Sequence, residues 1–92
     1  MAYNRYNLGT AVLLECTFQV SSTDTDPTTV SLSVSDPNGN TDIYTYSGGT
    51  VIKTATGKYN KEITPDERGY WKYTWTGTGT CTVVNSHKFI VE

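Results

Sequence analysis

The sequence predicts an all-β protein, a β-sandwich of seven to eight antiparallel strands that residues 1–92 form as a single domain. Apolar and polar residues alternate in several segments, which is typical of strands with one buried face. Turn signals rich in Gly, Asn, Asp and Pro separate these segments about every ten residues, as in sandwiches and small barrels. No window carries apolar residues at helical spacing, so we expect no helix of any length.

The clearest strand is predicted over residues 11–20, because its alternate positions separate into an apolar and a largely polar face. The face expected to point inward consists of Val12, Leu14, Cys16, Phe18 and Val20. Residues 1–8 are expected to form an N-terminal arm or an edge strand. Residues 21–28 are expected to form a polar loop, because Pro27 cannot donate to a strand ladder.

Three further strands are predicted in the middle of the chain, over residues 29–35, 41–46 and 58–63. In the first, Val30, Leu32 and Val34 should face the core. The segment DPNGN (36–40) is a strong turn signal, because Asn-Gly tolerates the positive φ of hairpin turns. A weaker strand is expected over residues 50–54.

The last two strands are predicted over residues 69–76 and 80–92, joined by a turn at residues 77–79. Trp71, Tyr73 and Trp75 share one face of the first, and three large aromatic side chains in a row indicate its core side. Near the end of the second, Phe89 and Val91 should point inward. In the predicted strand 41–46, Ile43 and Thr45 share one face, and Asp42, Tyr44 and Tyr46 share the other.

Charge and cysteine content exclude several classes of function. The net charge is −2, and the seven basic residues are scattered, so we expect no nucleic-acid partner. No apolar run approaches the ~20 residues that span a bilayer, so no membrane partner is expected. The N-terminal residues lack the apolar core of a secretory signal, which favours folding in the cytoplasm. Cys16 and Cys81 are expected to be free buried thiols rather than a disulfide.

The sequence contains only incomplete patterns for a metal site or a catalytic site. Asp36, Asn38, Asn40 and Asp42 alternate as in calcium loops, but Thr41 and Ser47 stand where such a loop needs Gly and Glu. We expect a hairpin turn there; a weak surface calcium site including Asp24 and Asp26 is the alternative. His87 has no recognisable catalytic partner. The protein is therefore expected to be no enzyme and to use no cofactor.

Two resemblances to known protein families imply a more specific fold class. DERGYWKY (66–73) resembles the Asp-x-Gly-x-Tyr-x-Cys start of the sixth strand in immunoglobulin-like domains, with Trp71 in place of the corner tyrosine and Tyr73 in place of the cysteine. The second covers nearly the whole chain, through YNLGTAVLLECTF, DPTTVSLSVSDPNGN, GKYNKEI, GYWKYTWTGTG and KFIVE. These segments are similar to a family of small immunoglobulin-like proteins encoded among the structural genes of tailed bacteriophages. The fold class implied is an immunoglobulin-like β-sandwich.

The phage resemblance implies a virion structural protein that folds in the host cytoplasm. We expect capsid decoration or head stabilisation, with the major capsid protein as partner and self-association as a further contact. A head-tail adaptor or tail-associated module, bound to the portal or an adaptor, is the first alternative. A carbohydrate- or surface-binding module of the adhesin type is the second.

Tyrosine is enriched at protein interfaces, so outward tyrosines are candidate contacts. The candidate interface residues are Tyr3, Tyr6, Leu13, Tyr44, Tyr46 and Tyr70. Exposed strand edges offer a further route, by addition of a partner strand.

Overall fold

A computed structural model describes residues 4–92, which contain ten β-strands and no helix. The predicted all-β class is therefore confirmed for these residues. The strands are β1 (Asn4–Tyr6), β2 (Val12–Thr17), β3 (Gln19–Val20), β4 (Thr23–Asp24), β5 (Thr29–Ser35), β6 (Thr41–Thr45), β7 (Ile52–Ala55), β8 (Lys58–Ile63), β9 (Gly69–Thr78) and β10 (Val83–Val91). Strands β5 and β8 have the predicted bounds.

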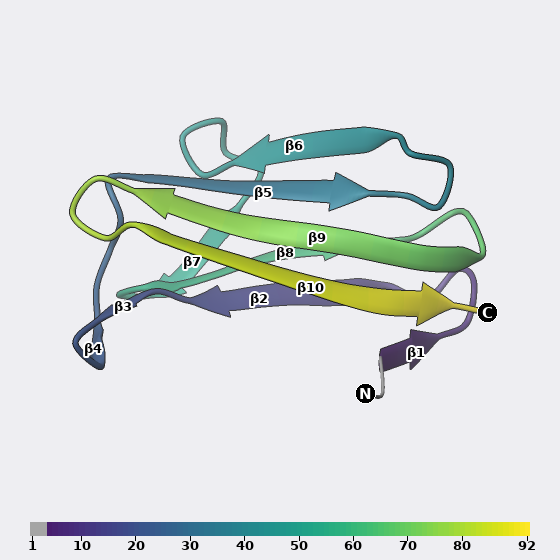
Figure 1. The fold of residues 1–92 in the computed structure, drawn as a ribbon, viewed down its shortest axis with the longest axis horizontal. Helices are drawn as coiled ribbons and strands as arrows, with labels where there is room; N and C mark the ends of the chain where they lie inside the picture. Colours follow the sequence, from purple (N-terminus) through teal and green to yellow (C-terminus); the bar gives the residue numbers. More distant parts are fainter. Residues whose placement is uncertain (1–3) are drawn as a thin grey trace.

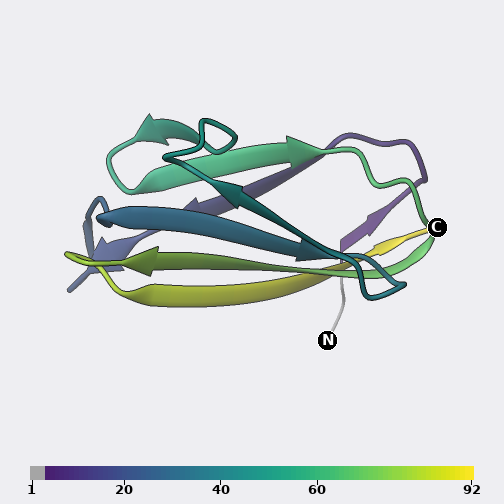
Figure 2. The ribbon, with the colours of Figure 1, turned by 90° about the horizontal axis from the view of Figure 1, so that it is seen from above.

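Eight of the strands form two layers that face each other (Figures 1 and 2). The larger sheet has the order β1-β10-β9-β5-β6, and the smaller has the order β2-β8-β7. Buried side chains from both sheets form one core cluster, which includes Leu14 and Tyr59 of the smaller sheet and Leu32 and Trp75 of the larger. The arrangement is consistent with the predicted β-sandwich.

The strands are not all antiparallel as predicted, because β1 pairs with β10 in parallel. Backbone hydrogen bonds extend this pairing at the chain end, where Leu8 donates to the carbonyl of Glu92 and Glu92 donates to the carbonyl of Tyr6. The N-terminal segment is thus an edge strand beside the C-terminal strand (Figure 1).

The strand predicted over residues 11–20 is interrupted at Phe18. Its backbone N–H donates to Gly57 (2.7 Å), and its carbonyl accepts from Thr25 (2.9 Å), so the chain leaves the β2–β8 ladder there. Strands β3 and β4 then form a two-residue hairpin inside the predicted polar loop. The inward prediction is confirmed for Val12, Leu14, Cys16 and Phe18 and is wrong for Val20, which is exposed. The two strands of this hairpin raise the number from the predicted seven to eight to the observed ten.

The last hairpin turn lies later than predicted, because β9 continues to Thr78. Gly77 is a strand residue rather than a turn residue. A Cβ at this position would lie 2.8 Å from Pro27 Cγ and 2.9 Å from Phe18 Cε1, so close packing across the core requires glycine here. The predicted core positions Trp71, Trp75, Phe89 and Val91 are all buried, and Tyr73 packs against them.

Candidate functional site

The outer surface of the five-stranded sheet is the candidate interface, and it faces the reader in Figure 1. Small hydroxyl side chains alternate with buried apolar ones along β5 and β9, so the hydroxyls all point away from the core. We call the outward side chains of β5, β6, β9 and β10 the hydroxyl face. Its principal members are Ser31, Ser33, Ser35, Ile43, Tyr70, Lys72, Thr74, Thr76, Val84, Ser86 and Lys88.

Strand register places these side chains in rows across the sheet. In one row, Ile43 lies opposite Ser33, which lies opposite Thr74, which lies opposite Ser86. Thr74 and Ser86 share a hydrogen bond between their hydroxyl oxygens of 3.0 Å. The row centres on Ser33 and Thr74, which are half-buried by their neighbours. The middle of the face is therefore neutral and built of short polar side chains.

Larger side chains surround this neutral centre. Ile43, Tyr70 and Val84 are 66%, 63% and 64% exposed, respectively. Each would remove apolar surface from water if a partner covered it, which favours association by about 25 cal/mol per Å² buried. An exposed apolar rim around a neutral centre is compatible with contact to another macromolecule.

Charge on the hydroxyl face is limited to one end. Lys72 and Lys88 are exposed and lie directly opposite each other on β9 and β10. The outward positions of β5, β6, β9 and β10 carry no Asp or Glu. The nearest carboxylate along the chain is that of Glu92, just beyond β10, which accepts a hydrogen bond from Arg5 at 2.8 Å.

A shallow hollow of about 330 Å³ lies beside these two lysines, and Tyr70 and Trp71 complete its lining. Trp71 is held by its indole N–H, which donates to the backbone carbonyl of Glu67 at 3.0 Å, and by stacking on Phe89. Trp71 is therefore anchored in the core.

A second hollow, also of about 330 Å³, lies on the open side of the sandwich between β6 and β8. Tyr44 and Lys61 approach each other across it, with the ammonium 5.1 Å from the ring centre. This cation–π contact joins the two sheets, because Tyr44 belongs to β6 and Lys61 to β8. Asp42, Glu62 and Asp66 line the same hollow.

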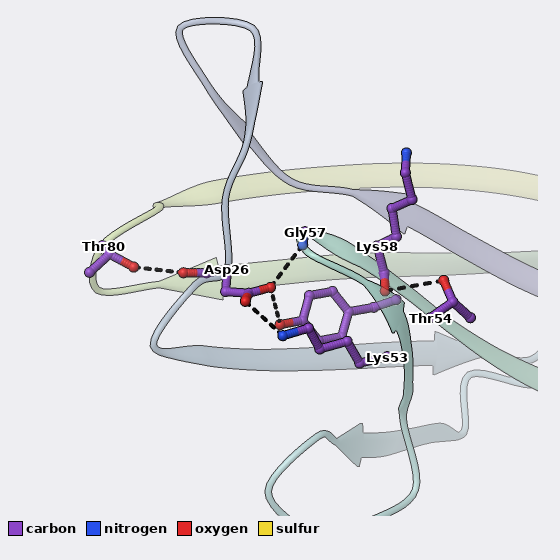
Figure 3. Close-up of polar contacts among 7 residues, drawn as sticks. Asp26, Lys53, Thr54, Gly57, Lys58 and Thr80 are labelled. Carbon is purple, nitrogen blue, oxygen red and sulfur yellow. Dashed lines mark hydrogen bonds and ion pairs between the residues drawn. The ribbon is translucent and has the colours of Figure 1, made fainter.

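The opposite end of the molecule is held by Asp26 (Figure 3). Its carboxylate accepts hydrogen bonds from Lys53 (2.7 Å), the Gly57 backbone N–H (2.8 Å) and the Tyr59 hydroxyl (3.1 Å). Its backbone carbonyl accepts from Thr80 (2.7 Å). The segment before β5 is thereby tied to the β7–β8 hairpin and to the β9–β10 turn.

These contacts shift the pKa values of both partners. Hydrogen bonding from Lys53, Gly57 and Tyr59 lowers the pKa of Asp26, despite some desolvation. Burial, followed by the hydrogen bond to the Asp26 carboxylate, raises the pKa of Tyr59 to about 12. The Asp26 carboxylate thus accepts hydrogen bonds from three donors of the same chain, and its role is to stabilise the fold.

Asp36 and Asp24, two residues of the alternative calcium site, have partners within the chain. The Asp36 carboxylate accepts hydrogen bonds from the backbone N–H groups of Asn38 and Asn40, which fixes the predicted turn. Asp24 forms an ion pair with Lys58. Among residues 4–92, no three His, Cys, Asp or Glu side chains are grouped so that they could hold a metal ion.

The candidate tyrosines do not form one patch. Tyr6 is half-buried and packs edge-on against Phe89, and Tyr46 packs edge-on against Tyr59 while staying 46% exposed. Leu13 is exposed on the outer surface of the smaller sheet, opposite to the surface that carries Tyr70. Tyr3 lies outside the described residues.

The expectation that Tyr44 points outward is wrong, because its ring packs against the core. Ile43 takes the outward position instead. Sequence alternation showed that the two residues lie on opposite faces of one strand. It could not say which face was buried, because both carry an apolar residue.

The hydroxyl face itself was missed by sequence reasoning. The serines of SLSVS (31–35), together with Thr74 and Thr76, follow the same period-two pattern that identified the core residues. These polar residues form one continuous surface only because the strands lie in the order β10-β9-β5-β6, and this order is not visible in the sequence.

The two cysteines are buried free thiols, as predicted. The thiol of Cys16 lies 3.5 Å from Asn85 Nδ2, and that of Cys81 lies 3.7 Å from the carbonyl of Gln19. Burial raises the pKa of Cys16. Within residues 4–92, no helix has the length and apolar character needed to span a bilayer.

Comparison with known protein families, with curated proteins and with solved structures finds no significant match to this chain.

Proposed function

We propose that this chain is an immunoglobulin-like binding module that acts through protein–protein contacts and carries out no chemistry. Its contact surface is the hydroxyl face. Within a phage particle it is a virion structural protein, and its most favoured role is capsid decoration or head stabilisation.

The strand order supports the immunoglobulin-like part of the proposal. In such domains, strands B, E and D form one sheet, and strands C, F and G form the other. The orders β2-β8-β7 and β5-β9-β10 follow the same connectivity, with β6 added beside β5 as the variable type adds a strand beside C. The bond from Trp71 to Glu67 also corresponds to the tyrosine corner, whose hydroxyl bonds backbone a few residues upstream.

The observation that carries the binding proposal is the neutral centre of the hydroxyl face. Interface centres are depleted of charge, because a buried charge loses its hydration. Ser33, Thr74 and Ser86 supply hydroxyls that donate or accept. Tyr70, Ile43 and Val84 add apolar surface around them.

The resemblance to proteins encoded among phage structural genes supports a place in the virion. A capsid offers many identical binding sites, so a small module with modest affinity for each subunit still covers a shell when contacts are linked. The major capsid protein is therefore the favoured partner, and contacts between neighbouring copies of this chain are compatible with the same role.

The test is association with purified phage particles, using a matched pair of variants. Ser33→Arg places a long cation at the half-buried centre of the hydroxyl face. Asn60→Arg does the same on the outer surface of the smaller sheet, where Asn60 is also half-buried between Glu15 and Ile52. We expect Ser33→Arg to lower the copy number per particle by about tenfold or more and Asn60→Arg to leave it unchanged.

The outcomes separate the alternatives. Many copies spread over the shell support decoration, whereas a few copies at one vertex support a head-tail adaptor. Absence of the protein from particles, with specific binding to a glycan array, would favour the adhesin-type module and reject the structural role.

A further inference from the structure

We propose that Lys72 and Lys88 form a binding site for a carboxylate carried by an acidic segment of the protein partner. This inference rests on the proposed function, because it names the chemistry by which one end of the hydroxyl face would recognise that partner.

The two lysines are an unfavourable pair within the isolated chain. They are register partners on antiparallel strands, so their side chains leave the sheet on the same side with Cβ atoms about 5 Å apart. Like charges directly opposite in a sheet are destabilising. An external anion between them would remove this repulsion and gain charge-assisted hydrogen bonds.

The chain supplies no such anion from the described residues. Three basic side chains have carboxylate partners, namely Arg5 with Glu92, Lys53 with Asp26 and Lys58 with Asp24. Lys72 and Lys88 have no ion pair with any of residues 4–92. On its other side, Lys72 lies opposite Ser35, which is neutral.

The surface beside the pair is shaped to receive a side chain. The hollow of about 330 Å³ is lined by Tyr70, Trp71 and the two lysines. A Glu or Asp side chain placed there would bring its methylene groups against the tyrosine ring and its carboxylate toward the ammonium groups. Tyr70 thus supplies apolar contact, and the lysines supply charge.

An acidic protein segment fits these observations better than a polyanion. Binding of nucleic acid requires many cations to neutralise successive phosphates, and this face offers two. The chain also carries a net charge of −2, which repels an extended polyanion at long range. Two cations beside an aromatic ring match a single carboxylate.

The site can be tested on the intact chain by NMR titration at low ionic strength. The probe is the capped dipeptide acetyl-Glu-Glu-amide, with acetyl-Gln-Gln-amide as the neutral control. We expect saturable amide shifts at Lys72, Lys88 and Tyr70 with the acidic peptide only. The double variant Lys72→Gln/Lys88→Gln should weaken binding by about tenfold or more, because both charges are lost.

Lys58→Gln is the matched control, since Lys58 is an exposed lysine on the other sheet. It should bind the acidic peptide as the wild type does. Unchanged binding by the double variant would overturn the proposal. Equal affinity for inorganic phosphate, or tighter binding of a DNA oligonucleotide, would also overturn it and would identify a general anion site or a nucleic-acid site.

The outcome is distinguishable from failure of the proposed function. If the peptide does not bind but Ser33→Arg still prevents particle association, the carboxylate site is wrong and the hydroxyl face remains the interface. If Ser33→Arg has no effect on particle association, the interface is wrong whatever the peptide does.

Discussion

Tyr59 of β8 donates its hydroxyl proton to the carboxylate of Asp26, which lies in the segment before β5, at a distance of 3.1 Å. This bond joins two segments that lie 33 residues apart in the sequence, and Figure 3 shows the contacts that surround Asp26. It ties the segment that leads into β5 of the larger sheet to β8 of the smaller sheet.

Alkaline pH should weaken the fold through Tyr59. Its pKa is raised from 10.0 to about 12, so the folded state holds the proton more tightly than the unfolded state. The resulting stability is fully present below pH 10 and is lost as pH rises toward 12. Urea unfolding from pH 9 to 12 should show the stability falling.

Tyr59→Phe isolates this effect. At pH 7 it should cost about 1 kcal/mol, which is the net value of one hydrogen bond. It should also flatten the fall in stability between pH 10 and 12, because the group that titrates is gone. A variant whose stability falls as steeply as that of the wild type would show that Tyr59 is not responsible.

Acid should weaken the fold through Asp26. Its pKa is lowered in the folded state, so the stability it contributes is present above the ordinary value of 3.8 and is lost as pH falls through the folded value. The unfolding midpoint of Asp26→Asn should therefore depend less on pH below 4 than that of the wild type. Equal acid sensitivity of the two proteins would contradict the Asp26 cluster.

Reversing one charge of the lysine pair should stabilise the isolated protein. Lys72→Glu replaces repulsion across the β9–β10 ladder by attraction to Lys88, a gain of roughly 0.5–1 kcal/mol at low ionic strength. The gain should shrink in concentrated salt, because exposed charges are screened. Lys58→Glu, which disrupts the Asp24 pair, should give no such gain. A destabilised Lys72→Glu variant would mean that the two lysines do not repel each other.

The two tryptophans should differ in their response to phenylalanine. Trp71→Phe removes the hydrogen bond to Glu67 as well as indole packing, and we expect a loss of about 2 kcal/mol. Trp75 Nε1 is buried without a hydrogen-bond partner in residues 4–92, so Trp75→Phe removes an unsatisfied donor and offsets part of its packing loss. Urea denaturation should show that Trp71→Phe loses at least as much free energy of unfolding as Trp75→Phe does. A much larger loss in Trp75→Phe would contradict this ranking.

The thiols should be protected by the fold. Burial raises the pKa of Cys16, so little of its reactive thiolate forms at pH 8. Both cysteines are buried, so a reagent in solution has little access to either. A thiol reagent such as DTNB should react slowly with the native protein and should titrate two thiols per chain in urea. Finding no free thiol after unfolding would reveal a disulfide instead.

Sequence periodicity predicted strands β5 and β8 with their observed bounds and the core positions Trp71 and Trp75. Those segments bury one face, and their apolar residues lie on that face alone. The same rule failed on β6, where Ile43 and Tyr44 compete for the inward position. Only packing against the other sheet selects Tyr44.

Long-range contacts explain the remaining differences. The break at Phe18 depends on Gly57, and the parallel pairing of β1 depends on the C-terminal strand beside it. Neither partner is close in sequence to the segment it affects. The lysine pair was missed for the same reason, because Lys72 and Lys88 meet only through the β9–β10 register.

The most direct test of the central claim is a cryo-electron-microscopy reconstruction of phage particles that carry the protein. We expect ordered density for this chain at repeated sites on the shell, with the hydroxyl face covered and Ser33 and Thr74 at the contact. Density in which that face is open to solvent and the smaller sheet makes the contact would contradict the account, as would particles without the protein.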